Sequence, residues 1–312
     1  MRVLVTGGMG FIGSHLVERL LSEGFKVRIL DVNIKKDNIK HLLSNPQLEL
    51  VKGNICNPEV CKDAVKDCEI ISHLAALISV DYSIEKPRPF WEVNVGGTFN
   101  LLEAATDAEA ERFHYMSSCE IYGNIPEPKN ADEDYPLCIP RSPYAASKYA
   151  AESYCRAYHA TYDFPIVIIR AFNVFGPRQK IGARGAMIAN FITRVLNDEP
   201  PLIFGEGKQS RDWSFVTDIA DGIFKSLVSK KCVGETINLC NGIGRTVKDV
   251  ALQTINICGK KGKIQPKIIN ARPGEVFRSV GDYSKAKKLL DWKPKIGFEE
   301  GLERTIKFFR SR

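Results

Sequence analysis

Three glycines near the start of the chain constrain its fold more than any other feature of the 312-residue sequence. They are Gly7, Gly10 and Gly13, and they follow a continuous apolar run over residues 2–6 that predicts a buried strand. Apolar residues then recur at helical spacing up to Gly24, which predicts a helix that begins at the glycines. Such a turn lets the backbone approach a pyrophosphate at the N-terminus of the helix, so the pattern predicts a dinucleotide site.

The next predicted strand, over residues 26–31, ends on the carboxylate of Asp31. A carboxylate at this place accepts hydrogen bonds from the ribose hydroxyls of adenosine and repels a 2′-phosphate, so the sequence favours NAD over NADP. Arg28 precedes Asp31 and does not reverse this preference.

The alternation of strand and helix continues through the first half of the chain. Further strands are expected over residues 48–54, 69–76, 112–118 and 165–176. Helices are expected over residues 58–67, 91–108 and 144–161. Strands that alternate with helices form a parallel sheet covered on both faces, so the fold class is α/β, a Rossmann-type doubly wound parallel sheet.

Beyond residue 176 the pattern loosens into loops rich in Gly, Pro and Arg. Helices are expected there near residues 186–197, 216–229, 246–258, 284–290 and 299–310. We therefore assign residues 1–175 to an NAD-binding Rossmann domain and residues 176–312 to a smaller C-terminal substrate-binding lobe. The boundary is approximate, and the chain can cross between the lobes.

Composition narrows the classes of function. Lys and Arg number 44 against 37 Asp and Glu, a net charge of only +7, and the basic residues are scattered, so no nucleic-acid partner is expected. Nine cysteines without a CxxC pair and five scattered histidines favour reduced thiols and no metal site. The first residues lack the pattern of an export signal, and no apolar run approaches the roughly 20 residues that span a bilayer. We expect a cytoplasmic protein without a membrane partner.

Tyr144 and Lys148 lie four residues apart on the predicted helix 144–161, which places a phenol and an ammonium on one face. The ammonium and a positive nicotinamide would lower the pKa of the tyrosine. Tyr144 could then take a proton from a substrate hydroxyl while hydride leaves for the cofactor. Because Ser117 and Ser118 end a strand of the same predicted fold, the pattern favours a dehydrogenase site over an exposed helix pair.

A series of motifs follows in order along nearly the whole chain: TGGMGFIGSHL (6–16), HLAA (73–76), NVGGTFNLLEA (94–104), SSCEIYG (117–123), SPYAASK (142–148), RAFNVFGPRQ (170–179), RDWSFVTDIADG (211–222) and RPGEVFRSVGDYSKAKKLLDWKP (272–294). Together they resemble the extended short-chain dehydrogenase/reductase family, specifically its nucleotide-sugar epimerases and dehydratases. The resemblance implies bound NAD, a nucleotide-diphosphate sugar as substrate, and a homodimer formed through the helices near residues 94–106 and 144–160.

The resemblance also assigns residues to the cofactor. The pyrophosphate turn would consist of Gly7, Gly10, Phe11, Ile12 and Gly13, with Asp31 on the ribose. The other contacts to NAD would come from Asn33, Asn54, Ile55, Leu74, Ala75, Ala76, Asn94, Tyr144 and Lys148. Family members often have Asp-Ile where this chain has Asn54 and Ile55, and an amide can still contact adenine.

On the substrate side, the resemblance makes Ser118, Tyr144 and Lys148 the catalytic set, with Ser118 and Tyr144 reaching the C4 oxygen of the sugar. Asn173, Arg211 and Arg272 match positions that hold the nucleotide diphosphate. Arginine suits this task because its planar fork binds phosphate oxygens in pairs.

The resemblance implies oxidation of the sugar at C4 with retained NAD, after which the reactions diverge. A 4,6-dehydratase needs a base at C5 and an acid at the C6 hydroxyl, whereas a 4-epimerase needs little further acid–base chemistry. Ser118-Cys119-Glu120 resembles the Thr-Asp-Glu or Thr-Ser-Glu of dehydratases. Glu120 is therefore the candidate catalytic base at C5, and Cys119 stands where the acid would be.

We accordingly favour a 4,6-dehydratase that acts on a UDP-sugar, and we expect this substrate to be a UDP-N-acetylhexosamine. The alternative is a UDP-hexose 4-epimerase that acts on UDP-glucose or UDP-GlcNAc. A nucleotide-sugar decarboxylase also carries Glu at this position and is a weaker alternative, as is an NAD-binding protein without catalysis.

Overall fold

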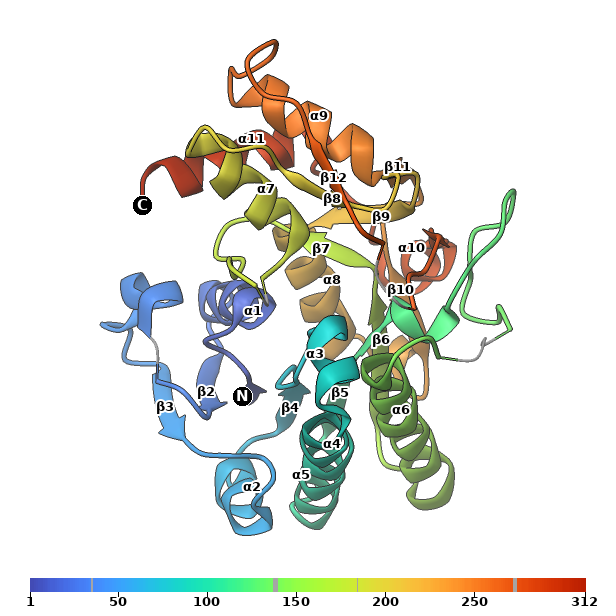
Figure 1. Ribbon diagram of the computed structural model, residues 1–312. Coiled ribbons are helices and arrows are strands. Elements are labelled where there is room, and N and C mark those ends of the chain that lie inside the picture. Colours follow the sequence, from blue (N-terminus) through green and yellow to red (C-terminus); the bar gives the residue numbers. More distant parts are fainter. Residues whose placement is uncertain (35, 137–139, 184, 272–273) are drawn as a thin grey trace.

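The computed structural model describes residues 1–34, 36–136, 140–183, 185–271 and 274–312. A seven-stranded sheet in the order β10-β6-β5-β4-β1-β2-β3 forms its centre, and every strand pair in it is parallel (Figure 1). The strands are β1 (Arg2–Thr6), β2 (Lys26–Asp31), β3 (Leu48–Lys52), β4 (Ile70–His73), β5 (Arg112–Ser118), β6 (Ile166–Ala171) and β10 (Thr236–Leu239). The strand order reverses between β1 and β4, which confirms the Rossmann-type sheet and marks where such sheets bind ligands.

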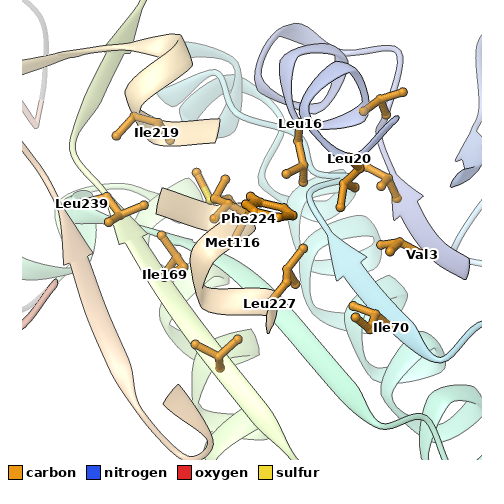
Figure 2. Packing of buried hydrophobic residues seen from close by; sticks show 14 of the residues in the cluster. Val3, Leu16, Leu20, Ile70, Met116, Ile169, Ile219, Phe224, Leu227 and Leu239 are labelled. Carbon is orange, nitrogen blue, oxygen red and sulfur yellow. The ribbon is translucent and has the colours of Figure 1, made fainter. Parts of the chain in front are cut away.

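Two layers of helices cover this sheet, because successive strand residues point to opposite faces. Val3 and Val5 of β1 face one core, part of which Figure 2 shows, whereas Leu4 faces the other. The helices on the first face are α1 (Phe11–Ser22), α8 (Val216–Val228) and α10 (Ser284–Leu290). The helices on the second face are α2 (Pro58–Val65), α5 (Gly97–Asp107) and α6 (Pro143–Tyr162).

A second lobe carries its own apolar core. Its larger sheet runs β11-β9-β13 with β7 beside β9, and a smaller sheet pairs β12 with β8. The strands are β7 (Asn173–Phe175), β8 (Leu202–Phe204), β9 (Ser210–Phe215), β11 (Gly244–Thr246), β12 (Lys267–Ile269) and β13 (Arg278–Ser279). The helices are α7 (Met187–Leu196), α9 (Val247–Ile257) and α11 (Phe298–Arg310).

The expected helices after residue 140 are confirmed, with both ends within one residue. Among the helices of the described ranges, none is both long and apolar enough to cross a membrane.

The single strand expected over residues 165–176 is wrong, because the chain changes sheets within it. β6 ends at Ala171, and β7 begins at Asn173 in the second lobe. Phe172 lies between them, with its side chain buried in an apolar cluster and its N–H donating to the carbonyl of Leu239 at 3.0 Å. An unbroken apolar pattern therefore hid a junction between the two lobes.

The helix expected over residues 91–108 is also wrong in its first part. It starts as a π-helical segment, Trp91–Gly96, and continues as α5 only from Gly97. Two short helices, α3 (Val80–Glu85) and α4 (Pro87–Phe90), come before it. The π-helical segment carries Asn94, which is buried, and such segments are frequent at functional sites.

After residue 175 the chain returns to the large sheet. α8 packs against α1, and β10 pairs with β6 at the edge of the sheet. Residues 216–239 thus lie with the first lobe. The chain first crosses between the lobes at Phe172 and crosses back later, so residue 175 is not a single division of the chain.

The turn between β1 and α1 packs so closely against neighbouring backbone that two of its glycines leave no room for a side chain. Gly7 has a φ of 69°, and a Cβ there would lie 2.9 Å from the backbone nitrogen of Ala75. A Cβ at Gly13 would lie far inside the contact distance of the Gly7 carbonyl oxygen. Only glycine fits at both places without moving backbone.

We expect Gly13→Ala to lower the free energy of unfolding by about 1–3 kcal/mol, because the added methyl group meets backbone that cannot yield. Urea unfolding followed by circular dichroism measures this change. Gly297→Ala is the matched control, since a Cβ at Gly297 would have no neighbour within 4 Å. Equal stability of the two variants would contradict the close packing of the turn.

Candidate active site

The glycine turn leaves the N-terminus of α1 open. α1 begins with Phe11 and Ile12. Its first backbone N–H groups lie beside the glycine turn, where Gly7 and Gly13 carry no side chains; this part of the turn is called the cradle below. Free N–H groups and the positive end of a helix dipole bind phosphate oxygens. The cradle therefore fits the pyrophosphate of a dinucleotide.

Asp31 lies beside this turn at the end of β2. Its carboxylate accepts hydrogen bonds from the backbone N–H groups of Met9 at 3.3 Å and Asn33 at 3.2 Å. A carboxylate has further lone pairs, which can accept the ribose hydroxyls. Arg28 points elsewhere and donates to Glu49 at 2.8 Å, so the surroundings of Asp31 fit NAD.

Asn94 connects the loop after β4 to helix α6. Its side-chain oxygen accepts from the N–H of Leu77 at 2.8 Å, and its Nδ2 donates to the Ser147 hydroxyl at 2.9 Å. Residues 74–76 lie half-buried in this loop, opposite the glycine turn, where Ala75 nears Gly7. Asn94 thus holds the wall of the cofactor site, and direct contact with NAD stays a prediction for it and for residues 74–76.

Three other expected cofactor residues have different surroundings. Ile55 is 4% exposed and packs against Gly97, so its side chain belongs to the core. Asn54 accepts from the N–H of Cys56 at 3.0 Å and closes its own turn, whereas Asn33 is exposed. Contacts from these residues to the adenosine of NAD stay predictions.

Ser118 and Tyr144 meet at the carboxyl end of β5. The Ser142 hydroxyl caps α6 by accepting from the N–H of Ala145 at 3.1 Å, which places Tyr144 in the first turn of the helix. The Ser118 hydroxyl hydrogen-bonds to the phenol of Tyr144. Lys148 lies one turn further along α6, so the structure brings the expected catalytic set together.

Burial shifts the pKa of both Tyr144 and Lys148. The pKa of Lys148 falls to about 7, chiefly because burial disfavours its charged form. Burial raises the pKa of Tyr144, and the hydrogen bond from Ser118 opposes this only in part. The protein side chains therefore do not produce the lowered tyrosine pKa, and a lowering by the charge of an oxidised nicotinamide stays a prediction.

A buried ion pair between Glu152 and Arg170 supports the catalytic set. Glu152 lies one turn beyond Lys148 on α6 and accepts from Arg170 Nη2 at 2.6 Å and from the Ser117 hydroxyl at 2.6 Å. Arg170 Nη1 donates to the Tyr122 hydroxyl at 2.6 Å. The residues Ser118 to Glu120, at the carboxyl end of β5, are called the catalytic turn below. The pair thus connects α6 and β6 to Ser117 and Tyr122, on the two sides of this turn. No sequence motif marks this pair, although Glu152 continues the helical face of Tyr144 and Lys148.

Glu120 adds a carboxylate to this catalytic turn. Its backbone N–H donates to the Ser118 hydroxyl at 3.2 Å, and its half-buried side chain raises the pKa of Tyr144 through its charge. Burial raises the pKa of Glu120 itself, against the opposing charge of Arg211. A carboxylate with a raised pKa beside a reacting phenol suits proton transfer.

Cys119 lies in an apolar environment. Its side chain is 3% exposed and belongs to a cluster with Tyr122, Phe172 and Cys240. Burial raises the pKa of the thiol to about 12, which makes it a poorer proton donor than a free thiol. These surroundings favour packing over the acid role that we expected for it.

Asn173 and Arg211 come from paired strands of the second lobe, β7 and β9. Asn173 Nδ2 is buried and has no hydrogen-bond partner among the described residues, which is costly unless a ligand supplies one. Arg211 Nη2 pairs with Glu275 Oε1 at 2.8 Å. Arg272, the third expected diphosphate ligand, lies outside the described residues.

Within the described ranges, no group of three or more His, Cys, Asp or Glu side chains could hold a metal ion. The expectation that the protein needs no metal stays a prediction.

A pyrophosphate cradle, a ribose carboxylate and a Ser–Tyr–Lys set on one Rossmann sheet define an NAD-binding dehydrogenase/reductase of the extended short-chain type. The family model described as GDP-mannose 4,6 dehydratase matches residues 4–305, and the chain belongs to this family of nucleotide-sugar enzymes. NAD is the cofactor of this family: two neighbours of this chain are solved with NAD, and the glycine turn and the surroundings of Asp31 fit it here.

Named relatives include both dehydratases and epimerases. A dTDP-glucose 4,6-dehydratase of Streptomyces niveus is 34% identical and covers 99% of this chain and 93% of its own. A UDP-glucose 4-epimerase of Thermus thermophilus, solved with NAD, is 36% identical, has a TM-score of 0.90 and covers 99% of both chains. A UDP-glucose 4-epimerase of Thermotoga maritima, solved with UDP-glucose, is 32% identical, has a TM-score of 0.92 and covers 100% of this chain and 99% of its own.

The lowered pKa of Lys148 predicts a pH-dependent stability. Its pKa is about 7 in the folded protein against an ordinary value of 10.5 in an unfolded chain, so the unfolded state binds more protons between these pH values. The stability of the wild type should therefore rise with pH in this window relative to Lys148→Met. Urea unfolding without added NAD should show the largest advantage of Lys148→Met below pH 7 and a shrinking one toward pH 10.

Lys52→Met on the exposed edge strand β3 is the control, and its difference from the wild type should stay constant with pH. A constant difference for Lys148→Met as well would contradict the desolvation of this ammonium.

Proposed function

We propose that this protein oxidises a nucleotide sugar at C4 and then removes water across C5 and C6, as a 4,6-dehydratase that retains its NAD. The observation that carries the proposal is Glu120, a carboxylate two residues from Ser118 whose charge acts on the Tyr144 phenol. Oxidation at C4 alone uses the Ser–Tyr–Lys set. A further acid–base group beside it suits removal of the C5 proton.

In this proposal Tyr144, Ser118 and Glu120 each have a separate role in the reaction. NAD, held by the glycine turn and Asp31, would supply the hydride chemistry that oxidises C4 and later reduces C6. Tyr144 takes the proton of the C4 hydroxyl, and Ser118 hydrogen-bonds to the same oxygen. The C4 ketone acidifies the C5 proton, which Glu120 removes as the C6–oxygen bond breaks. The departing hydroxide takes up the proton that Tyr144 received from the C4 hydroxyl and leaves as water. Glu120 then returns a proton to C5, so the net change is loss of one water without net oxidation.

We place the nucleotide in a cavity of about 190 Å³ in the second lobe, lined by Phe204, Gln209, Phe277 and Glu275 among others. Two aromatic side chains suit stacking with a base. Glu275 also pairs with Arg211, so the cavity adjoins the expected diphosphate position. A UDP-sugar is our proposed substrate, by analogy with the neighbour solved with UDP-glucose, and an N-acetylhexosamine is our proposed sugar.

A 4-epimerase is the second candidate, and the surroundings of Cys119 favour it. The thiol that would protonate the leaving C6 hydroxyl is buried among apolar side chains with a pKa of about 12. An epimerase needs no acid at C6, because only the C4 ketone turns over before reduction.

The homodimer and the cytoplasmic location also stay proposals. Aromatic side chains on α5 and α6 support a subunit contact there, since Phe99 packs against Tyr154 with ring centroids 5.5 Å apart. Tyr154 and Tyr162 are 45% and 61% exposed and join one aromatic cluster through Phe99 and Tyr158, and a contiguous exposed patch of this kind suits a contact between proteins.

Proton NMR in deuterated water tests the reaction with UDP-N-acetylglucosamine, UDP-glucose and dTDP-glucose. A dehydratase gives a 4-keto-6-deoxy sugar with deuterium at C5. Glu120→Gln should slow this conversion by roughly 10²–10⁴-fold, the usual contribution of a general base, and Tyr144→Phe should abolish it. Glu127→Gln is the matched control on an exposed carboxylate and should react like the wild type.

A C4 epimer that keeps its C5 proton would establish the epimerase instead and reduce Glu120 to a binding or structural residue. Undiminished dehydration by Glu120→Gln would exclude Glu120 as the base.

A further inference from the structure

Arg211 pairs in this structure with the carboxylate of Glu275. Its guanidinium contacts Glu275 Oε1 at 2.8 Å and donates to the carbonyl oxygens of Ser210 at 3.0 Å and Phe277 at 3.4 Å. The Arg211 side chain is 11% exposed, and that of Glu275 is 32% exposed. The ion pair therefore lies at the rim of the site, with one partner reachable from solvent.

The same guanidinium acts on Glu120. The charge of Arg211 lowers the pKa of Glu120, and the charge of Glu275 raises it. The other titratable neighbours of Glu120 are Cys119 and Tyr144, whose pKa values its charge raises. In the part of the chain that the structure describes, no residue donates a hydrogen bond to the Glu120 carboxylate. Arg211 is thus shared between a rim carboxylate and the carboxylate beside the catalytic tyrosine.

A diphosphate bound to Arg211 would need the guanidinium N–H groups that Glu275 now contacts. Arginine binds phosphate oxygens through paired N–H groups, as it binds a carboxylate. A partly exposed ion pair is weak, because water competes well for both partners. A ligand with more negative charge than a single carboxylate can therefore take the place of Glu275.

We propose that Glu275 is a positioning residue that holds Arg211 ready and gives it up to the diphosphate of the substrate, so that Glu275 and diphosphate compete for one guanidinium. The proposal rests on the proposed function, since it requires Arg211 to bind the diphosphate. It makes Glu275 a residue that weakens binding and favours ligands with two phosphates over ligands with one.

Calorimetric titration of UDP and dTDP into the NAD-containing protein tests the competition. Glu275→Gln keeps the shape of the side chain and removes its charge, and it should bind the nucleoside diphosphates roughly three- to tenfold more tightly than the wild type. UMP should gain less. Glu199→Gln is the matched control, because Glu199 pairs with Arg194 at 3.0 Å outside this cavity, and the affinity of this variant for the nucleoside diphosphates should change by less than about twofold.

A gain in affinity separates competition from a structural role, because a residue that only orients Arg211 would weaken binding when replaced. Unchanged or weaker binding by Glu275→Gln overturns the proposal, and so does an equal gain by Glu199→Gln. Adding Glu275→Gln to Arg211→Met should bring no further gain, and a gain that persists in this background also overturns it.

The single variant Arg211→Met distinguishes a failure of the role proposed for Glu275 from a failure of Arg211 as the diphosphate ligand. Loss of UDP and dTDP binding in Arg211→Met, without a gain in Glu275→Gln, removes only the role of Glu275. Undiminished binding by Arg211→Met removes Arg211 as the diphosphate ligand, and with it both this proposal and that part of the proposed function.

Discussion

The buried ion pair between Glu152 and Arg170 is the interaction on which the active site depends most. Both side chains are almost fully buried, and the pair joins α6, β6 and, through Ser117, the end of β5. Removing one partner of such a pair leaves an uncompensated buried charge and costs about 3–5 kcal/mol. The pair is therefore better understood as a device that fixes the position of the catalytic turn than as a source of stability.

Desolvation shifts the pKa values of the side chains that this ion pair helps to position. Lys148, Tyr144 and Glu120 all have a pKa shifted by burial in the direction that disfavours the charged form. Groups whose charged forms are disfavoured by burial have pKa values closer to neutrality in the case of Lys148 and Glu120, which suits proton exchange beside a charged cofactor. The ionised Glu152 stays apart from this exchange, because Arg170 holds its pKa below the usual range.

The sequence predicted those parts of the fold and site that depend on neighbouring residues. The glycine turn and the Tyr144–Lys148 helix face are local patterns, and the structure has both. The break at Phe172 was hidden because a buried residue between two sheets is as apolar as one within a strand. The pairs Glu152–Arg170 and Arg211–Glu275 join residues 18 and 64 positions apart, and no spacing rule connects them. The surroundings of Cys119 likewise come from distant segments.

Stopped-flow absorbance at 340 nm tests the central claim, that Ser118, Tyr144 and Lys148 support oxidation of a nucleotide sugar by NAD. The account predicts a transient rise when the NAD-containing protein is mixed with the UDP- or dTDP-sugar that it converts, and no rise in Tyr144→Phe. Conversion of the sugar without any reduced nicotinamide, or an equal transient in Tyr144→Phe, would contradict it.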